Sequence, residues 1–333
     1  MKSSEIQLSI IGLGLIGKQR LDAALDHGIS QNSISVYDPA ISEKNRKAYT
    51  EVQFVNSRDE ILSTPATHAI IATPHYLAKE YVNAFLEKNC QILLEKPLGR
   101  NLVEALEIFE NPNVEKLSVG FNYRFMPGVV ALKKQIGLGT LGEISSIRME
   151  LGHGGAPADK ESWKLDLERA GGGSLLDPGI HLIDLLLHLF SLKVEDVKII
   201  GASSWDGFWN TGIEELVNLI GTANGIPFDI TVSLVAWKTR FRIEVTGTDG
   251  YFEISGRGRS DGPQSTVLGK RWGWQNAPSQ SESEIREIVA EKDMSLEVET
   301  KSWLEGNIGL ADSHQSLQAM KLYDIMKQSL DAK

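Results

Sequence analysis

The sequence predicts an α/β protein, in which a doubly wound parallel sheet is followed by an α+β part with an open, mostly antiparallel sheet. Short apolar runs alternate with helix-like stretches over the first third of the chain, as βαβ units require. After about residue 125, turn signals such as Asn224-Gly225 and Asp249-Gly250 separate strand-like runs. A length of 333 residues is typical of two domains. We therefore expect one domain at residues 1–123 and a second at residues 124–333.

Each strand expected in the first domain is a short apolar run. These strands are Leu8–Gly12, Ile34–Asp38, His68–Thr73, Gln91–Lys96 and Leu117–Asn122. The helical stretches between them are Lys18–His27, Tyr76–Asn89 and Leu102–Glu110. Because parallel strands need crossover connections, this alternation predicts helices on both faces of the sheet.

The second domain mixes helices with alternating strands. Its expected elements are the helix Gly128–Gly137, the strand Glu143–Leu151, the helix Pro178–Phe190 and the C-terminal helix 312–329. Between Val194 and Ser255 apolar and polar residues alternate, which predicts an antiparallel meander. The loop Gly256–Gln264 shows no pattern.

The composition excludes several classes of function. Forty-four acidic and 34 basic residues give a net charge of −10, so we expect no nucleic-acid partner. The single cysteine, Cys90, excludes an intramolecular disulfide and a multi-cysteine zinc site. The apolar run Leu182–Phe190 is too short to cross a bilayer. We expect a cytoplasmic protein with no metal and no membrane partner.

A glycine motif follows the first strand. Gly12, Gly14 and Gly17 form G-x-G-x-x-G directly before a helix, where the first backbone amides, from Leu15 and Ile16 onward, can bind a pyrophosphate. Asp38 ends the next strand about 20 residues later, where a carboxylate accepts hydrogen bonds from ribose hydroxyls.

The pattern predicts NAD in preference to NADP, because a carboxylate repels a 2′-phosphate. Arg46 keeps NADP open as an alternative. The other interpretation is an ordinary glycine-rich turn followed by a turn aspartate.

Lys96 lies at the carboxyl end of the strand Gln91–Lys96. Ligands bind at this edge of an open parallel sheet, so Lys96 can stabilise the alkoxide that develops as an alcohol is oxidised. The alternative is a surface lysine in a loop.

Asp177 and His181 form a second candidate pair. Asp177 precedes Pro178, which is typical of a helix N-cap, and His181 comes four residues later on the same helix face. A carboxylate beside an imidazole raises the basicity that a proton-abstracting base requires. The alternative is that Asp177 is only a cap and His181 only a core residue.

Taken together, these segments resemble the glucose–fructose oxidoreductase and inositol dehydrogenase (Gfo/Idh/MocA) family. The glycine motif, Glu95-Lys96-Pro97, Gly120–Phe125 and Gly172–Asp184 occur in the family's order and spacing. The resemblance implies a Rossmann domain followed by an open sheet that binds substrate and mediates oligomerisation, so we expect a homo-oligomer, a dimer or a tetramer, formed through that sheet. It also implies a catalytic trio of Lys96, Asp177 and His181, and a cis Lys96-Pro97 bond.

One segment departs from the family pattern. Where Thr-Pro-Asn-x-x-His is usual, this chain has Thr73-Pro74-His75 and then Ala78 in place of the histidine. The resemblance implies that the residues lining the cofactor, besides the glycine turn and Asp38, are Thr73, Pro74, His75, Glu95, Lys96 and Asn122.

The resemblance implies a small carbohydrate-like substrate: a sugar, a cyclitol or a nucleotide-linked sugar. The expected substrate contacts are Lys96, Arg124, Trp163, Lys164, Arg169, Asp177 and His181, with Trp163 either a sugar-stacking or a core residue. Aromatic clusters at Trp205, Phe208 and Trp209 and at Trp272 and Trp274 belong either to the pocket or to an interface. Two other functions stay open: an NAD-dependent glycoside hydrolase, and a dinucleotide-binding sensor without catalysis.

Overall fold

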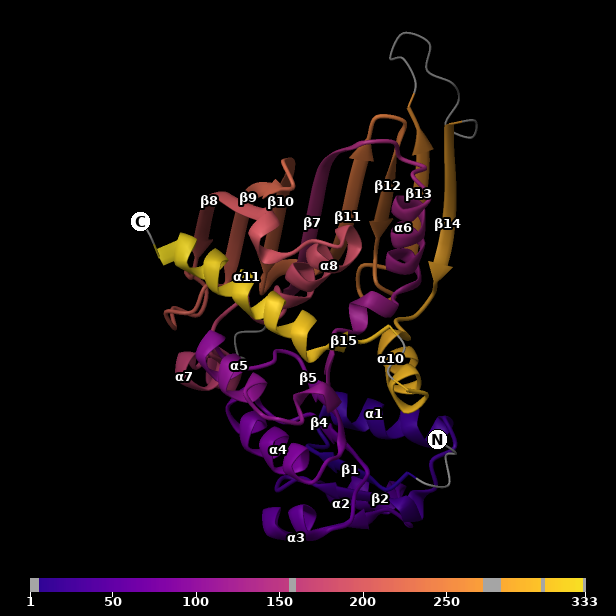
Figure 1. The fold of residues 1–333 in the computed structure, drawn as a ribbon, viewed down its shortest axis with the longest axis vertical. Coiled ribbons are helices and arrows are strands. Elements are labelled where there is room, and N and C mark those ends of the chain that lie inside the picture. Colours follow the sequence, from indigo (N-terminus) through magenta and orange to yellow (C-terminus); the bar gives the residue numbers. More distant parts are fainter. Residues whose placement is uncertain (1–5, 156–159, 272–282, 307–308, 332–333) are drawn as a thin grey trace. The chain divides into compact units, whose positions relative to one another are not determined.

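The computed structural model describes residues 6–155, 160–271, 283–306 and 309–331. The chain divides into two compact units (Figure 1). Unit 1 comprises Met1–Asn122, Glu168–Gly171 and Leu296–Met320, and unit 2 comprises Tyr123–Leu167, Gly172–Ser295 and Lys321–Lys333. This grouping differs from the expected division at residue 123, because two later segments fold with the first unit.

Unit 1 contains the parallel sheet. Its described strands are β1 (Leu8–Ile11), β2 (Ile34–Tyr37), β3 (Gln53–Phe54), β4 (His68–Ile71), β5 (Gln91–Glu95), β6 (Leu117–Gly120) and β15 (Ala311–Asp312). They follow the spatial order β15-β6-β5-β4-β1-β2-β3. Neighbours from β1 to β6 run parallel, whereas β15 is antiparallel to β6. The chain runs from β1 outward to β3 and then from β4 outward to β6, which confirms the predicted doubly wound sheet.

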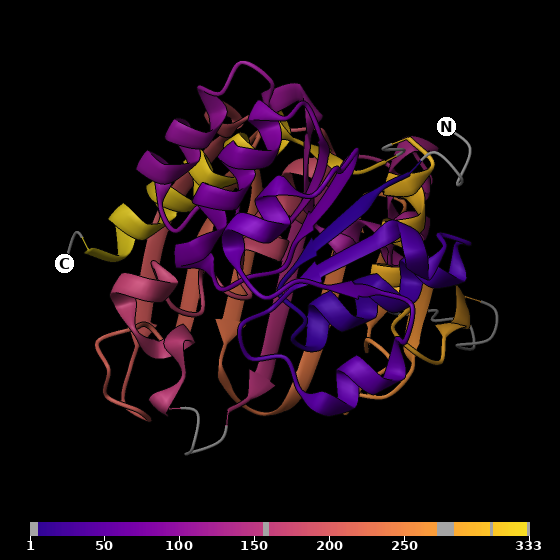
Figure 2. The ribbon, with the colours of Figure 1, turned by 90° about the horizontal axis from the view of Figure 1, so that it is seen from below.

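The helices of unit 1 lie on both sides of this sheet, as Figure 2 shows. They are α1 (Leu15–Asp26), α2 (Glu43–Ala48), α3 (Arg58–Ser63), α4 (His75–Glu87), α5 (Leu102–Phe109) and α10 (Ser295–Leu304). Right-handed crossovers in opposite directions put helices on opposite faces, with α1 packing on β1 and β4, and α4 on β4 and β5. Two more helices, α7 (Leu167–Ala170) and α11 (Ser313–Asp331), contain residues of both units, as does α10, whose first residue Ser295 belongs to unit 2.

Unit 2 contains a larger sheet. Its described strands are β7 (Ile144–Gly154), β8 (Val197–Trp205), β9 (Leu216–Ala223), β10 (Ile226–Ser233), β11 (Val235–Gly247), β12 (Gly250–Ser255), β13 (Gln264–Lys270) and β14 (Glu284–Ala290). The order is β14-β13-β12-β11-β7-β10-β9-β8. The predicted meander is therefore wrong in one respect: β7 lies between β10 and β11 and runs parallel to β10. Alternation shows which face a residue occupies, but not which strands are neighbours.

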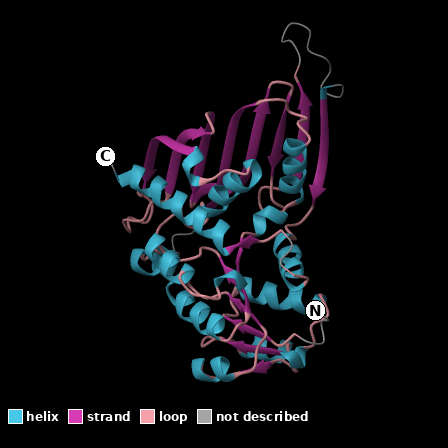
Figure 3. Ribbon diagram, in the orientation of Figure 1, coloured by secondary structure: helices cyan, strands magenta, loops and turns pink. Residues whose placement is uncertain are grey.

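Helices lie over one face of this sheet (Figure 3). Among them, α6 (Pro127–Gly137) packs on β12 to β14, and α8 (Ile180–Phe190) packs on β7. Residues such as Phe241, Ile243 and Val245 are buried, whereas alternate positions of the same strand carry charges. Nearly every residue of α8 is buried, so this helix forms the centre of the unit's core. Among the described residues, no helix is both long enough and apolar enough to span a bilayer.

Several elements had not been predicted, namely α10, β13 and β14 and the four shorter elements β3, α2, α3 and β15. The strands β3 and β15 have two residues each, and α2 and α3 have six each. Segments of this length complete less than two turns or two alternations, so they leave no apolar period in the sequence.

Candidate functional site

The turn after β1 requires glycine at two positions. Gly12 has φ of +88°, and a Cβ there would lie 2.5 Å from the carbonyl oxygen of Ala72. At Gly17 a Cβ would lie 2.0 Å from the carbonyl oxygen of Gly12. No side chain fits between these backbones, so both glycines are needed for the close packing of β1, β4 and α1.

Gly14 is different, because a Cβ at this position would meet nothing within 4 Å. It is the N-cap residue of α1 and supplies no capping side chain, and no acidic residue follows in the first turn. Leu15, the first residue of the helix, is 74% exposed. The open backbone and the uncapped helix N-terminus together fit the pyrophosphate of a dinucleotide.

Asp38 lies directly after β2 and contacts this turn. Its Oδ2 accepts a hydrogen bond from the backbone N–H of Leu13 at 2.6 Å, and its Oδ1 accepts one from Ala40 at 2.7 Å. Each carboxylate oxygen has a second lone pair, so the side chain can also accept hydrogen bonds from ribose hydroxyls. The residues present therefore fit an adenosine ribose beside the glycine turn.

The segment after β4 supplies further polar groups. Thr73 Oγ1 is buried and has no hydrogen-bond partner among the described residues. A buried hydroxyl without a partner fits a group that forms a hydrogen bond with a ligand. Pro74 is the N-cap residue of α4. His75 Nδ1 lies 3.0 Å from the carbonyl oxygen of Ala170, and because a carbonyl only accepts, Nδ1 carries the proton. His75, which replaces the family's asparagine, is thus fixed in one tautomer.

Lys96 follows the last residue of β5 and is half-buried in unit 1. The Lys96-Pro97 bond is cis, as the family resemblance implied. The preceding Glu95 accepts hydrogen bonds from the fully buried Arg20, whose Nε lies 2.8 Å from Glu95 Oε1. Arg20 also donates to Glu299 at 2.5 Å and to Thr300 Oγ1 at 2.9 Å. The backbone leading to Lys96 is therefore anchored by a saturated buried guanidinium.

The predicted capping role of Asp177 is wrong. The helix α8 begins at Ile180 with Gly179 as its N-cap residue, and the Asp177-Pro178 bond is cis. Asp177 thus lies in the turn before the helix, so the spacing rule for one helix face does not apply to it and His181. Its Oδ2 accepts a hydrogen bond from Lys164 Nζ at 2.8 Å.

His181 lies in the first turn of α8 and is only 5% exposed. Its ring stacks on the phenol ring of Tyr123, with ring centroids 3.9 Å apart and planes 4° from parallel. Phe241 packs edge-on against the same phenol ring at 5.5 Å. This aromatic contact fixes the plane of the imidazole.

Arg124 forms a buried ion pair. Its Nε and Nη2 donate to the two carboxylate oxygens of Asp184, at 2.8 and 2.5 Å, and both side chains are less than 5% exposed. Burial raises the pKa of the Asp184 carboxyl, and the charge of Arg124 opposes that rise. The pairing gives Arg124 a structural role, and its expected contact with substrate stays a prediction.

The remaining predicted contacts belong to different elements of the two units. Trp163 is half-buried, and Lys164 Nζ lies 5.8 Å from the centroid of its ring. Arg169 is exposed, and its guanidinium lies over the ring of Tyr76. Asn122 is the last residue of unit 1 before Tyr123.

The aromatic clusters differ in burial. Trp209 is a core residue packed with Leu165 and Leu234, whereas Trp205 and Phe208 are about half exposed. Trp272 and Trp274 lie outside the described residues.

Sequence reasoning missed two groups of the cluster that contains His181, namely Tyr123, which stacks on His181, and Arg257, which contacts the Tyr123 ring. The guanidinium carbon of Arg257 lies 5.2 Å from the centroid of the Tyr123 ring. Arg257 belongs to the loop 256–263, where no periodic pattern marks it. The glycines with positive φ on either side, Gly256 and Gly258, were the one local signal of a fixed backbone.

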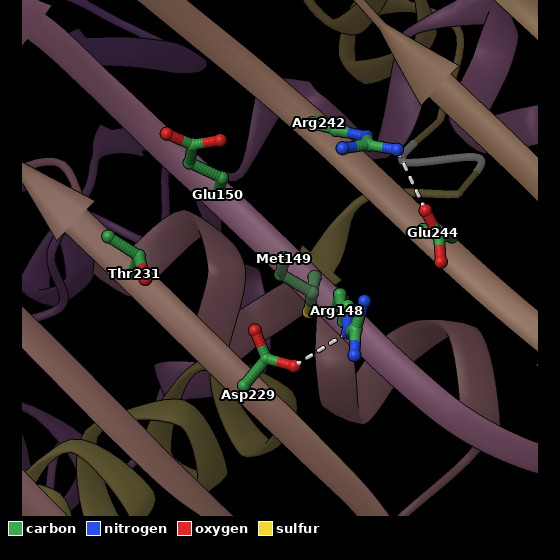
Figure 4. Close-up of a pocket in the computed structure, with 7 residues that line it drawn as sticks. All are labelled: Arg148, Met149, Glu150, Asp229, Thr231, Arg242 and Glu244. Carbon is green, nitrogen blue, oxygen red and sulfur yellow. Dashed lines mark hydrogen bonds and ion pairs between the residues drawn. The ribbon is translucent and has the colours of Figure 1, made fainter.

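A depression on the open face of the second sheet is not a candidate site (Figure 4). It is lined by Arg148, Met149, Glu150, Asp229, Thr231, Arg242 and Glu244. Its charges are paired with one another or with Arg240: Arg148 with Asp229 at 3.2 Å, Arg242 with Glu244 at 2.8 Å and Glu150 with Arg240 at 2.9 Å. Because α8 packs on the other face of β7, this surface lies on the opposite side of the sheet from that helix.

Family models match both the N-terminal and the C-terminal part of the chain. Residues 6–122 match the model of an oxidoreductase family with an NAD-binding Rossmann fold, and residues 129–253 match the GFO/IDH/MocA C-terminal domain. Glucose-6-phosphate 3-dehydrogenase of Bacillus subtilis (strain 168) is 28% identical over 284 residues, which cover 77% of this chain and 79% of that one. The scyllo-inositol 2-dehydrogenase (NADP+) of the same organism is 28% identical over 195 residues, 57% and 53% of the two chains.

Solved structures share the fold. Levoglucosan dehydrogenase in complex with NADH and levoglucosan superposes with a TM-score of 0.82 over 98% of this chain and 97% of that one, at 18% identity. Family models match both parts of the chain and solved structures share its fold, so the resemblance predicted from the sequence is confirmed. The chain belongs to the Gfo/Idh/MocA family of oxidoreductases with an NAD-binding Rossmann domain.

Proposed function

We propose that this chain is an NAD-dependent oxidoreductase acting on a secondary alcohol, or the corresponding ketone, of a sugar, a cyclitol or a nucleotide-linked sugar. The observation that carries the proposal is the turn after β1. Gly12 and Gly17 have no room for a side chain, whereas Gly14 faces open space at an uncapped helix N-terminus. Close backbone packing explains the glycines at positions 12 and 17. It does not explain Gly14, whereas the approach of a pyrophosphate does.

Several residues would hold the cofactor. The amides at the start of α1, at Leu15 and Ile16, would bind the pyrophosphate, and Asp38 would accept hydrogen bonds from the ribose hydroxyls. The lining residues proposed from the family resemblance are Thr73, Pro74, His75, Glu95 and Asn122. When bound, NAD supplies the hydride acceptor for the carbon that carries the substrate's hydroxyl group.

The side chains of this chain would handle the proton and the developing charge. His181 takes the proton of the substrate hydroxyl as general base, with its ring plane fixed by Tyr123. Lys96 donates to the oxygen that becomes an oxyanion. Asp177, itself bound by Lys164, stabilises the imidazolium that forms. In the reverse direction His181 returns the proton to the carbonyl oxygen.

Other predictions from the sequence stay predictions. Trp163 and Arg169 are proposed substrate contacts. A homo-oligomer formed through the second sheet and a cytoplasmic location also remain to be tested. Each is compatible with the described residues and needs its own measurement.

The first test is the absorbance of NADH on mixing the protein with NAD⁺ and a panel of sugars, cyclitols and sugar nucleotides, with NADP⁺ in parallel. We expect turnover with at least one compound. Lys96→Ala and His181→Ala should each lower kcat by about 10²- to 10⁴-fold, because each removes a group that acts on the reacting oxygen. NAD⁺ affinity, measured by fluorescence titration, should change little.

Unchanged turnover in both variants would contradict the assigned roles. Release of a glycoside's leaving group without accumulation of NADH would favour hydrolysis instead. NAD⁺ binding with neither reaction across the panel would favour a sensor.

The glycine turn offers a matched pair of variants for the cofactor site. Gly14→Ala adds a methyl group where the protein has room, so folding should be preserved while NAD⁺ affinity falls by about 10-fold or more. Gly17→Ala forces a methyl group against the Gly12 carbonyl, so both stability and affinity should fall. Full NAD⁺ affinity in Gly14→Ala would show that no cofactor approaches this backbone.

A further inference from the structure

Arg257 is a buried cation whose charge is not met by an anion. The residue is 8% exposed, and its Nε has no hydrogen-bond partner among the described residues. Within the part of the chain that the structure describes, no carboxylate lies within 4.0 Å of its guanidinium. Burial lowers the pKa of Arg257 to about 10. Burying an unpaired guanidinium is unfavourable, so a compensating group is expected.

The neighbouring carboxylates offset that cost only in part, because they attract Arg257 without pairing with it directly. Arg259, in the same loop, takes Asp293 as its partner at 3.3 Å, and Asp293 also accepts hydrogen bonds from Ser295. Asp261 lies four residues beyond Arg257, yet neither of its buried carboxylate oxygens has a hydrogen-bond partner among the described residues. Asp261 and Asp293 therefore attract Arg257 from a distance, but among the described residues neither makes a direct ion pair with it.

The group that Arg257 does contact is an aromatic ring. Its guanidinium carbon lies 5.2 Å from the centroid of Tyr123, the ring on which His181 stacks at 3.9 Å. A ring face attracts the positive charge but offers no oxygen to the five N–H donors of a guanidinium. The contact therefore orients Arg257 on the same aromatic ring as the proposed base while leaving its donors for another group.

We propose that Arg257 binds an anionic group of the substrate, a phosphate or a carboxylate, while the oxidised carbon lies at His181. The proposal rests on the proposed function, since it takes His181 as the residue that meets the reacting hydroxyl. Guanidinium groups pair with both anions through two parallel hydrogen bonds. The substrate class is thereby narrowed from sugars in general to anionic sugars such as a hexose phosphate or a hexuronate.

The test measures binding rather than turnover. The protein saturated with NADH is titrated calorimetrically with glucose 6-phosphate, with glucuronate and with glucose. We expect at least one anionic probe to bind about 10-fold or more tightly than glucose, and the tighter of the two distinguishes a phosphate from a carboxylate. Arg257→Gln should abolish the difference, and Arg257→Lys should keep part of it. Arg259→Gln, which removes the same charge from the same loop, should leave it intact.

Several outcomes would overturn the proposal: neither anionic probe binds, glucose binds as tightly as both, or Arg257→Gln keeps the preference. A loss of the preference in Arg259→Gln as well would show a general effect of charge. The outcome for the proposed function is separate. Anion binding that depends on Arg257 but gives no NADH with NAD⁺ would refute the function alone, whereas turnover of neutral sugars without preference would refute the anion site alone.

Discussion

Two buried arginines of unit 2 differ in how their charge is met. Arg124 makes two hydrogen bonds to Asp184 on α8, which leaves both side chains nearly inaccessible to solvent. Arg257 lies against the face of Tyr123 and has no ion-pair partner among the described residues. Arg124 directly follows Tyr123 in the sequence, and Arg257 contacts the Tyr123 ring. The two arginines thus lie near the same residue, but only Arg124 is paired with a carboxylate.

The difference teaches that burial alone does not assign a role to an arginine. Arg20 in unit 1 follows the pattern of Arg124, because its donors are taken by Glu95, Glu299 and Thr300. A guanidinium saturated by the protein stabilises the fold around the site. One that is desolvated over an aromatic ring keeps hydrogen-bond donors for a ligand.

The largest effect is expected for Arg124→Met. Removing the cation leaves the Asp184 carboxylate buried and unpaired, which should lower the free energy of unfolding by about 3–5 kcal/mol at neutral pH. Urea unfolding followed by circular dichroism measures this change. A loss below about 1 kcal/mol would show that the pair is not needed for stability and would remove the contrast with Arg257.

A double variant separates the charge from the packing. Arg124→Met with Asp184→Leu replaces both charges by apolar groups of similar size, and it should recover most of the stability lost in the single variant. If the double variant is as unstable as Arg124→Met alone, the cost comes from packing around α8 rather than from the unpaired carboxylate.

The free energy of unfolding of Arg124→Met should also depend on pH, because the variant leaves the Asp184 carboxyl unpaired. Burial raises the pKa of Asp184, and without Arg124 only the weaker attraction of Lys133 opposes that rise. In the variant, the pKa of Asp184 is higher in the folded state than in the unfolded state. Its contribution to stability is therefore fully present below the unfolded pKa, where the carboxyl is protonated in both states. That contribution is lost as the pH rises through the folded pKa, because the buried carboxyl must then ionise. The difference in unfolding free energy from wild type should therefore be smaller, by about 1 kcal/mol, near pH 5 than near pH 8. A difference that is constant over this range would show that Asp184 does not titrate there.

The sequence carries most information about the proposed site where its residues are close together along the chain. Gly12, Gly14 and Gly17 lie within one turn, and Asp38 follows the next strand and accepts a hydrogen bond from Leu13, so local spacing was enough to propose a cofactor site there. Lys96 was placed correctly at the end of β5 because a strand end can be read from a short apolar run.

Features that depend on distant residues could not be predicted in this way. The place of β7 between β10 and β11 depends on which strands pair, and the ion pair of Arg124 joins residues 60 positions apart. Asp177-Pro178 has the local pattern of a helix start, yet α8 begins at Ile180. That local preference was overridden by the way the glycine-rich segment before it folds, since the backbone N–H of Gly173 and that of Ser174 bond to Glu214.

The smallest effect on stability is expected for Arg257→Gln. The substitution removes a cation–π contact worth about 0.5–2 kcal/mol, and it also removes the cost of burying an unpaired charge. These terms oppose each other, so the free energy of unfolding without ligand should stay within about 1 kcal/mol of wild type. Urea unfolding beside Arg124→Met measures the contrast directly, and Arg257→Lys serves as the control that keeps the charge. A loss of about 3 kcal/mol or more in Arg257→Gln would make Arg257 a structural residue like Arg124, because only a guanidinium already paired within the fold costs that much to remove.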